Sequence, residues 1–466
     1  MEKFEISGDW WVPESPDYKI SGSLKFNAAE DTILELNGSF YKFPNVPNPY
    51  ETIILGIDKT GIRFTLKHCR LLSVSRDLYN DKLFESKYAV NLIYKNFHFH
   101  KTEDIKFNKM SIEINHLYEW AGISGFNDLP NYFKGSGEIN IKYINPKASE
   151  LFSFNGFSLM IITNNSLTIP FVQNELQLKE KTYLVIENNE ATTFYEFHKI
   201  INIFTHFLNF VTLKPNYELS ILAFSMPYSN LREDGIEVPT PPVEIFFKKP
   251  FIKDSKKLDI YEILFRYNDD KDKIRNVLLE WFKNYQNYRQ IFILFSSSLY
   301  NENTYNEHQF LSLVQCLEIF HRIKYEQTKT ATKELPDSEF ELRKKQILTS
   351  VTTLWKDWIK RKLTNYSTLR ERLFDIINES EYILKDFFDI DKFINRTVKT
   401  RNYITHYSSE INEMVLENSE MAIYTEKLKL ILTVSILSEL GFNHIEIKQI
   451  ISNHVHYNNL KNFTID

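Results

Sequence analysis

Polar and apolar residues alternate along most of the first 190 residues. Within residues 19–26, Ile20, Leu24 and Phe26 fall on one side of an extended chain, and the lysines and serines fall on the other. Residues 34–40 repeat the pattern. A period of two is typical of strands that have one buried face. We therefore predict an antiparallel sandwich or a barrel-like sheet in the N-terminal half.

One amphipathic helix is expected to interrupt these strands. Phenylalanine, isoleucine and leucine recur at helical spacing between residues 193 and 212. Strands resume over 218–224 and 244–248. Between them, residues 238–242 contain three prolines, which lack a backbone N–H, so we expect a loop there.

The pattern changes to a helical period after the charged residues 268–273, which we take as a domain boundary. The helices expected beyond it cover 273–299, 306–325, 339–363, 368–377, 391–407, 417–440 and 445–453. The predicted fold class is α+β. A β-rich N-terminal domain (1–270) with one embedded helix precedes an all-α helical bundle (271–466).

Composition and charge argue against several classes of protein. The 466-residue chain has a formal net charge of −5. This argues against nonspecific coating of nucleic acid, which needs a broad basic surface. Cys69 and Cys316 lie far apart, so we expect two core thiols and neither a disulfide framework nor a zinc set. We expect a soluble, cytoplasmic protein, because the longest apolar run, near 430–437, is far shorter than the roughly 20 residues of a membrane span.

Arg401, Asn402 and His406 form the strongest candidate site. Asn402 and His406 are four residues apart and share a helix face, and Arg401 lies beside them with a long reach. Histidine can transfer protons near neutral pH, and arginine can neutralise charge on a phosphate. This set suits metal-independent RNA cleavage, in which a ribose 2′-hydroxyl attacks its own phosphate. One histidine cannot readily be both acid and base, so a second subunit is expected to complete the site.

The spacing alone leaves a structural explanation open. The helix dipole favours a histidine near a helix C-terminus whatever its function, and Asp391 is expected to cap the start of this helix. A basic stretch with interleaved tryptophans, residues 343–372, could guide RNA or form a solvated helix face. No metal or cofactor is expected. The candidate RNA-binding residues are Lys360, Arg361, Lys362, Arg396 and Lys399.

Several segments resemble one protein family. Residues 401–407 are similar to the Arg-polar-x-x-x-His signature of HEPN nucleases, and residues 315–322 resemble the first core helix of that domain. Three short segments resemble the opening of the N-terminal domain of ApeA-like proteins, namely residues 8–13, 20–24 and 36–40. The resemblance implies supporting roles for Glu318, Tyr403 and Tyr407, with the acidic residue facing the motif.

The same resemblance implies a biological role. ApeA-like proteins act in abortive infection, the defence of bacteria against phage, through an RNA-cleaving toxin domain. The N-terminal domain would restrain that domain until a phage-derived trigger appears. The implied partners are an RNA substrate and a second copy of the chain, in a homodimer or a higher even oligomer.

Two other hypotheses remain open at this stage. In the first, the protein is a non-catalytic module whose helical domain dimerises or holds RNA. Its β-rich domain would then grip a ligand with Trp10 and Trp11, although these could equally be core residues. In the second, scattered histidines and carboxylates form a metal-dependent hydrolase.

Overall fold

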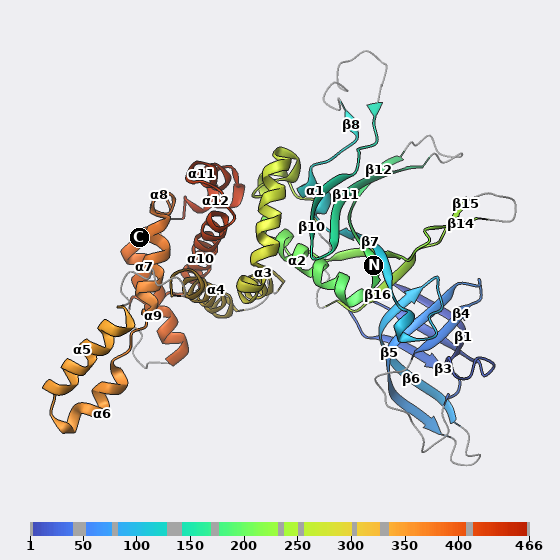
Figure 1. The fold of residues 1–466 in the computed structure, drawn as a ribbon, viewed down its shortest axis with the longest axis horizontal. Helices are drawn as coiled ribbons and strands as arrows, with labels where there is room; N and C mark the ends of the chain where they lie inside the picture. The colour runs from blue at the N-terminus through green and yellow to red at the C-terminus, as the bar shows by residue number, and fades with distance from the viewer. Residues whose placement is uncertain are drawn as a thin grey trace. The chain divides into compact units, whose positions relative to one another are not determined.

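The computed structural model describes residues 3–40, 53–76, 83–127, 142–168, 177–231, 237–249, 256–300, 305–326, 335–406 and 413–463. The chain forms two compact units, one rich in strands and one helical (Figure 1). The strand-rich unit comprises Met1–Leu208, Asn216–Leu258 and Arg266–Arg275. The helical unit comprises Asn209–Pro215, Asp259–Phe265 and Asn276–Asp466. The chain therefore passes between the units more than once.

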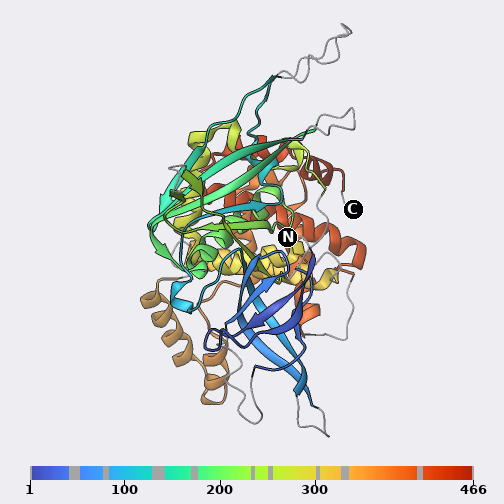
Figure 2. The ribbon, with the colours of Figure 1, turned by 90° about the vertical axis from the view of Figure 1, so that its right-hand side faces the viewer.

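A closed antiparallel barrel forms the first part of the strand-rich unit. Its strands follow the order β6-β3-β2-β1-β4-β5, and β5 pairs with β6 to close the ring. Figures 1 and 2 show these strands in blue. Closure leaves the barrel without a free sheet edge. The strands are β1 (Phe4–Trp11), β2 (Ile20–Phe26), β3 (Thr32–Leu36), β4 (Ile54–Asp58), β5 (Arg63–Arg76) and β6 (Leu83–Lys95).

The barrel interior holds the apolar face that the alternation predicted. Ile20, Leu24 and Phe26 are buried there together with Trp10. Trp10 needs a glycine opposite it, because a Cβ added at Gly56 would lie 2.2 Å from its ring. Trp11 is also buried, with 7% of its surface exposed. The tryptophan pair is therefore part of the core and offers no ligand-gripping surface.

A second run of antiparallel strands continues from β6 in the order β16-β13-β7-β12-β11-β10. Two-stranded ribbons, β8 with β9 and β14 with β15, are separate from it. The main strands are β7 (Phe107–Ile114), β10 (Ser149–Phe154), β11 (Phe157–Thr168), β12 (Gln177–Thr192), β13 (Glu218–Phe224) and β16 (Val243–Phe247). The ribbon strands are β8 (Phe126–Asn127), β9 (Lys142–Tyr143), β14 (Ser229–Leu231) and β15 (Glu237–Pro239).

Two predictions for this region need correction. A short helix, α1 (Leu117–Ala121), accompanies the expected one, α2 (Phe194–Thr212), and Trp120 of α1 packs edge-on against Phe207 of α2. The expected loop 238–242 begins two residues later than predicted, because Pro239 ends β15. Proline is tolerated at this position because β15 lies at the edge of a two-stranded sheet.

The second unit is helical, as predicted. It contains α3 (Lys271–Tyr300) from Asn276 onward. Its other helices are α4 (Asn306–His321), α5 (Asp337–Ser350), α6 (Thr353–Lys362), α7 (Leu369–Glu379), α8 (Glu381–Leu384), α9 (Ile390–His406), α10 (Asn418–Glu439), α11 (His444–Asn453) and α12 (Val455–Leu460). Shorter turns in the chain are η1 (Thr102–Asp104), η3 (Ile260–Glu262), η4 (Tyr267–Asp269) and the π-helical η5 (Arg322–Glu326).

The single helix expected over 339–363 is two helices. Val351 and Thr352 adopt extended conformations between α5 and α6, with ψ values of 143° and 151°. Together with Thr353 they form three consecutive β-branched residues, whose restricted side chains disfavour a helix. Apolar spacing continues across the break, so it does not reveal this local preference.

Helix α10 supplies the centre of the helical core. Leu428, Ile431 and Leu432 are fully buried, so the apolar run near 430–437 is a core helix. No described helix is both long and apolar enough to cross a membrane. Cys69 and Cys316 are free and buried, as expected, and burial raises the pKa of both thiols.

Candidate functional site

The motif residues lie on the last turns of α9. Arg401 is half-buried, whereas Asn402 and His406 are exposed, and His406 is the final residue of the helix. Nη1 of Arg401 donates to Oδ1 of Asn402 over 3.3 Å. Tyr403 is half-buried, and Tyr407 lies outside the described residues. The polar groups of the motif are therefore accessible from the surface.

Helix α4 brings a carboxylate to this surface. Oε1 of Glu318 lies 3.7 Å from Nη2 of Arg401, and their side chains are 22% and 29% exposed. A pair this exposed and this long contributes at most about 1 kcal/mol to stability. Its main effect is to orient the guanidinium, which remains partly exposed. The acidic residue expected to face the motif thus lies beside Arg401.

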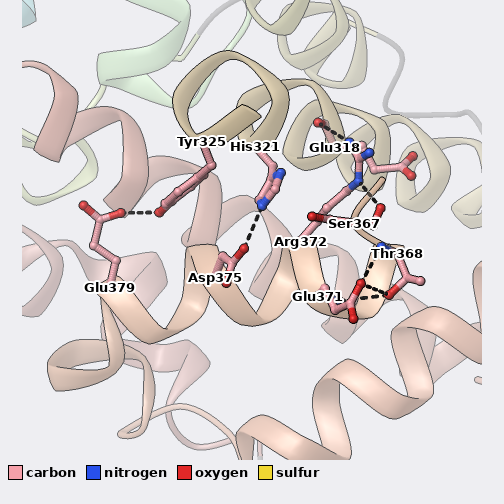
Figure 3. Close-up of polar contacts among 9 residues, drawn as sticks. All are labelled: Glu318, His321, Tyr325, Ser367, Thr368, Glu371, Arg372, Asp375 and Glu379. Carbon is pink, nitrogen blue, oxygen red and sulfur yellow. Dashed lines mark hydrogen bonds and ion pairs between the residues drawn. The ribbon is translucent and has the colours of Figure 1, made fainter. Parts of the chain in front are cut away.

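A buried polar cluster fixes the end of α4 that carries Glu318 (Figure 3). Nε2 of His321 lies 2.9 Å from Oδ2 of Asp375 on α7, and the two side chains are 0% and 4% exposed. Arg372, also on α7, donates to the backbone oxygens of Ser367 and Glu318 over 2.9 and 3.5 Å. These contacts fix the position of α4 relative to α7.

Sequence reasoning missed this cluster. His321 lies within residues 315–322, which resemble the first core helix of the HEPN domain. Its partner Asp375 is 54 residues further along the chain. A buried histidine one turn after Glu318 on an amphipathic helix was the available signal. It could not identify Asp375, because helical periodicity says nothing about which helices pack together.

The π-helical turn η5, which follows α4, forms ion pairs and hydrogen bonds with two further helices. Nζ of Lys324 lies 2.7 Å from a carboxylate oxygen of Glu379 and 2.9 Å from one of Glu439. The hydroxyl of Tyr325 donates to Glu379 (Figure 3). Burial would lower the pKa of Lys324, but the hydrogen bonds that it donates to both carboxylates raise it. Lys324 therefore stays charged and connects α4 to α7 and α10.

Arg396 has a different role from the one expected. Its side chain is 8% exposed and forms a bidentate pair with Glu420 of α10, with N–O distances of 2.8 and 2.7 Å. The hydrogen bond to Glu420 raises the pKa of Arg396. A guanidinium that is buried and paired in this way cannot contact RNA, so Arg396 anchors α9 to α10. Lys399 is exposed.

The N-terminal cap of α9 was predicted two residues too late. Oδ1 of Asp389 accepts a hydrogen bond from the backbone N–H of Lys392 over 2.7 Å. Asp391 lies inside the first turn and is exposed. The misplacement arose because either aspartate satisfies the capping preference, and only the backbone conformation distinguishes them.

We expect Asp389→Ala to lower the free energy of unfolding by about 1 kcal/mol, because it removes the acceptor for a helix N-terminal N–H. Asp391→Ala, which removes a charge from the same turn without removing the cap, should change it by less than about 0.5 kcal/mol. Urea unfolding followed by circular dichroism compares the two variants. Equal losses would contradict the assignment of Asp389 as the cap.

Two family models match the chain. The model for ApeA N-terminal domain 1 matches residues 5–281, and the model for the Apea-like HEPN domain matches residues 311–445. The second match contains both Glu318 and the motif on α9. No curated protein and no solved structure matches the chain.

Proposed function

Because the chain belongs to the ApeA family, in which a β-rich domain precedes a HEPN domain, we propose that it is an anti-phage protein that cleaves RNA without a metal ion. The observation that supports this most is the meeting of Glu318 and Arg401 at the surface. Two helices place an oriented cation there, and His406 ends the same helix.

The proposed reaction needs only proton transfer and charge stabilisation. The ribose 2′-oxygen attacks the adjacent phosphorus, and the bond from phosphorus to the 5′-oxygen breaks. A base takes the proton of the 2′-hydroxyl, and an acid gives one to the leaving 5′-oxygen. The products are a 2′,3′-cyclic phosphate and a 5′-hydroxyl end. Arg401 stabilises the charge on the phosphorane-like transition state, and Asn402 orients the phosphate or the imidazole.

His406 can supply one of the two proton transfers. The second comes from His406 of another copy in a homodimer or a higher even oligomer, so the active site is composite. This arrangement would make assembly through the helical domain a requirement for cleavage. The N-terminal domain would control the nuclease and respond to a phage-derived trigger in the bacterial cytoplasm.

The test is RNA cleavage by the purified full chain, alone or with lysate from phage-infected cells, in the presence of excess EDTA. We expect cleavage to persist, because no step uses a metal ion. The fragments should carry 2′,3′-cyclic phosphate and 5′-hydroxyl ends, which end-specific labelling distinguishes. Loss of cleavage on chelation, restored by added magnesium or zinc, would reject the mechanism.

A further inference from the structure

Helices α5 and α6 form a hairpin whose described side chains all lie outside the core. None of the residues of α6 is buried, and none of the described side chains of α5 is buried. Figure 1 shows the two helices side by side. Asn365 closes the base, because its side chain accepts from the backbone N–H of Leu335 over 3.1 Å and donates to the same residue's carbonyl over 2.8 Å. The hairpin is thus a self-contained surface element.

The hairpin exposes aromatic side chains that a folded protein usually buries. Trp355 and Trp358 on α6 are 54% and 51% exposed, and Tyr366 at the base is 74% exposed. The two tryptophans are three residues apart and share a helix face, with ring centroids 6.2 Å apart. Tryptophan is large and highly buried on average. Two half-exposed rings on one short helix therefore indicate a binding surface.

The same element is basic in an acidic chain. Residues 337–362 contain seven lysines and arginines and four aspartates and glutamates, a net charge of +3. Lys344, Lys345, Lys356 and Lys360 line a groove of about 610 Å³ between the helices. Lys344 pairs with Glu341 over 3.2 Å. No ion pair within the described part of the chain involves Lys356 or Lys360.

We propose that this hairpin is an arm that binds single-stranded RNA at a site separate from Arg401 and His406. The inference rests on the proposed function for the identity of the ligand. Exposed aromatic rings stack on bases of any sequence, and Arg361 and Lys362, which are exposed and follow Trp358 by three and four residues, can neutralise the phosphates beside them. A duplex keeps its base faces stacked inside, so the rings select unpaired strands.

Other occupants fit the surface less well. Lys362 follows Trp355 by seven residues and Trp358 by four, so its charge falls on the aromatic face. An interfacial membrane helix would keep that face apolar. A second copy of the hairpin would bring two lysine-lined grooves of like charge together. RNA can contact the rings and the charge of Lys362 on this one face.

Binding at the arm should raise affinity without altering the chemical step. Its loss would then raise the KM for long RNA, while kcat at saturation stays near that of the wild type. This separates the arm from the motif, whose loss lowers kcat.

The experiment uses the full chain carrying His406→Ala, so that RNA is bound and not cut. Fluorescence anisotropy measures binding of a labelled 20-nucleotide single-stranded RNA. We expect Trp355→Ala/Trp358→Ala to weaken binding at least about tenfold. Arg361→Ala/Lys362→Ala should weaken it and reduce the slope of log affinity against log salt by about 1.4. Folding is checked by circular dichroism, and the core should be unaffected because these residues are not buried.

Matched controls use exposed residues elsewhere in the helical unit. Tyr305→Ala removes an aromatic side chain that is 78% exposed, and Lys385→Ala/Lys448→Ala removes two exposed lysines. Both should bind RNA as the parent does. Duplex RNA of the same length should bind more weakly to the parent and be insensitive to the tryptophan substitutions.

Three outcomes would overturn the proposal. The first is unchanged RNA affinity in both hairpin variants. The second is unchanged RNA affinity with loss of binding to vesicles containing phosphatidylserine, which assigns the arm to a membrane. The third is unchanged RNA affinity with a changed mass in analytical ultracentrifugation, which assigns it to self-association. If the wild-type chain never cleaves RNA but the hairpin variants lose RNA binding, the nuclease mechanism fails and the arm stands.

Discussion

His406→Ala is expected to lower the rate of RNA cleavage by about 10²- to 10⁴-fold, because it removes the proposed acid or base from both halves of a composite site. Arg401→Ala should reduce the rate by about 10²- to 10³-fold, the size of effect found when a donor to a developing charge is removed. Arg401→Lys should retain part of the activity, because an ammonium keeps the charge but not the fork of donors. Single-turnover cleavage of a labelled RNA measures each rate.

The control for this series is His308→Ala, which removes an exposed histidine from α4 of the same unit. It should cleave at the wild-type rate and protect cells against phage. Undiminished cleavage in the Arg401→Ala/His406→Ala double variant would reject the assignment of the site. Protection of infected cells by His406→Ala, with intact host RNA, would instead favour the non-catalytic binding module.

Asp375→Ala should lower the free energy of unfolding by about 3 kcal/mol, the largest effect on stability that we expect from a polar residue of the site. The substitution leaves His321, which is fully buried, without its carboxylate partner. A buried polar group that loses its hydrogen bond retains the cost of desolvation. Asp375→Asn keeps an oxygen at hydrogen-bonding distance and should cost roughly half as much. Urea unfolding followed at 222 nm, where helices dominate, measures the difference.

Asp386→Ala is the matched control, because Asp386 is an exposed aspartate close to α7 in the sequence. It should change stability by less than about 0.5 kcal/mol. A comparable loss of unfolding free energy in both aspartate variants would show that the buried pair stabilises the protein no more than an exposed aspartate does. Because the pair fixes the turn that follows Glu318, Asp375→Ala should also reduce cleavage at temperatures where the protein is still folded.

The classes of structure and the candidate chemistry followed from the order of the residues alone. A period of two specified half-buried strands, and a period of 3.6 specified amphipathic helices, because both patterns follow from local backbone geometry. The same local geometry placed Asn402 and His406 on one helix face. Spacing also placed Arg401 beside them, and the family resemblance, carried by short motifs, added Glu318 as an acidic residue expected to face them.

How these elements meet depends on packing between parts of the chain that lie far apart in the sequence. Closure of the barrel depends on β6 pairing with both β3 and β5, and alternation along one strand does not name its neighbours. The pairing of His321 with Asp375 and of Arg396 with Glu420 depends on helix packing across 54 and 24 residues of sequence. From the sequence alone, every lysine or arginine is expected to be a solvated cation. Packing alone determines which of them, like Arg396, is buried in a pair and which, like Lys360, is exposed at the surface.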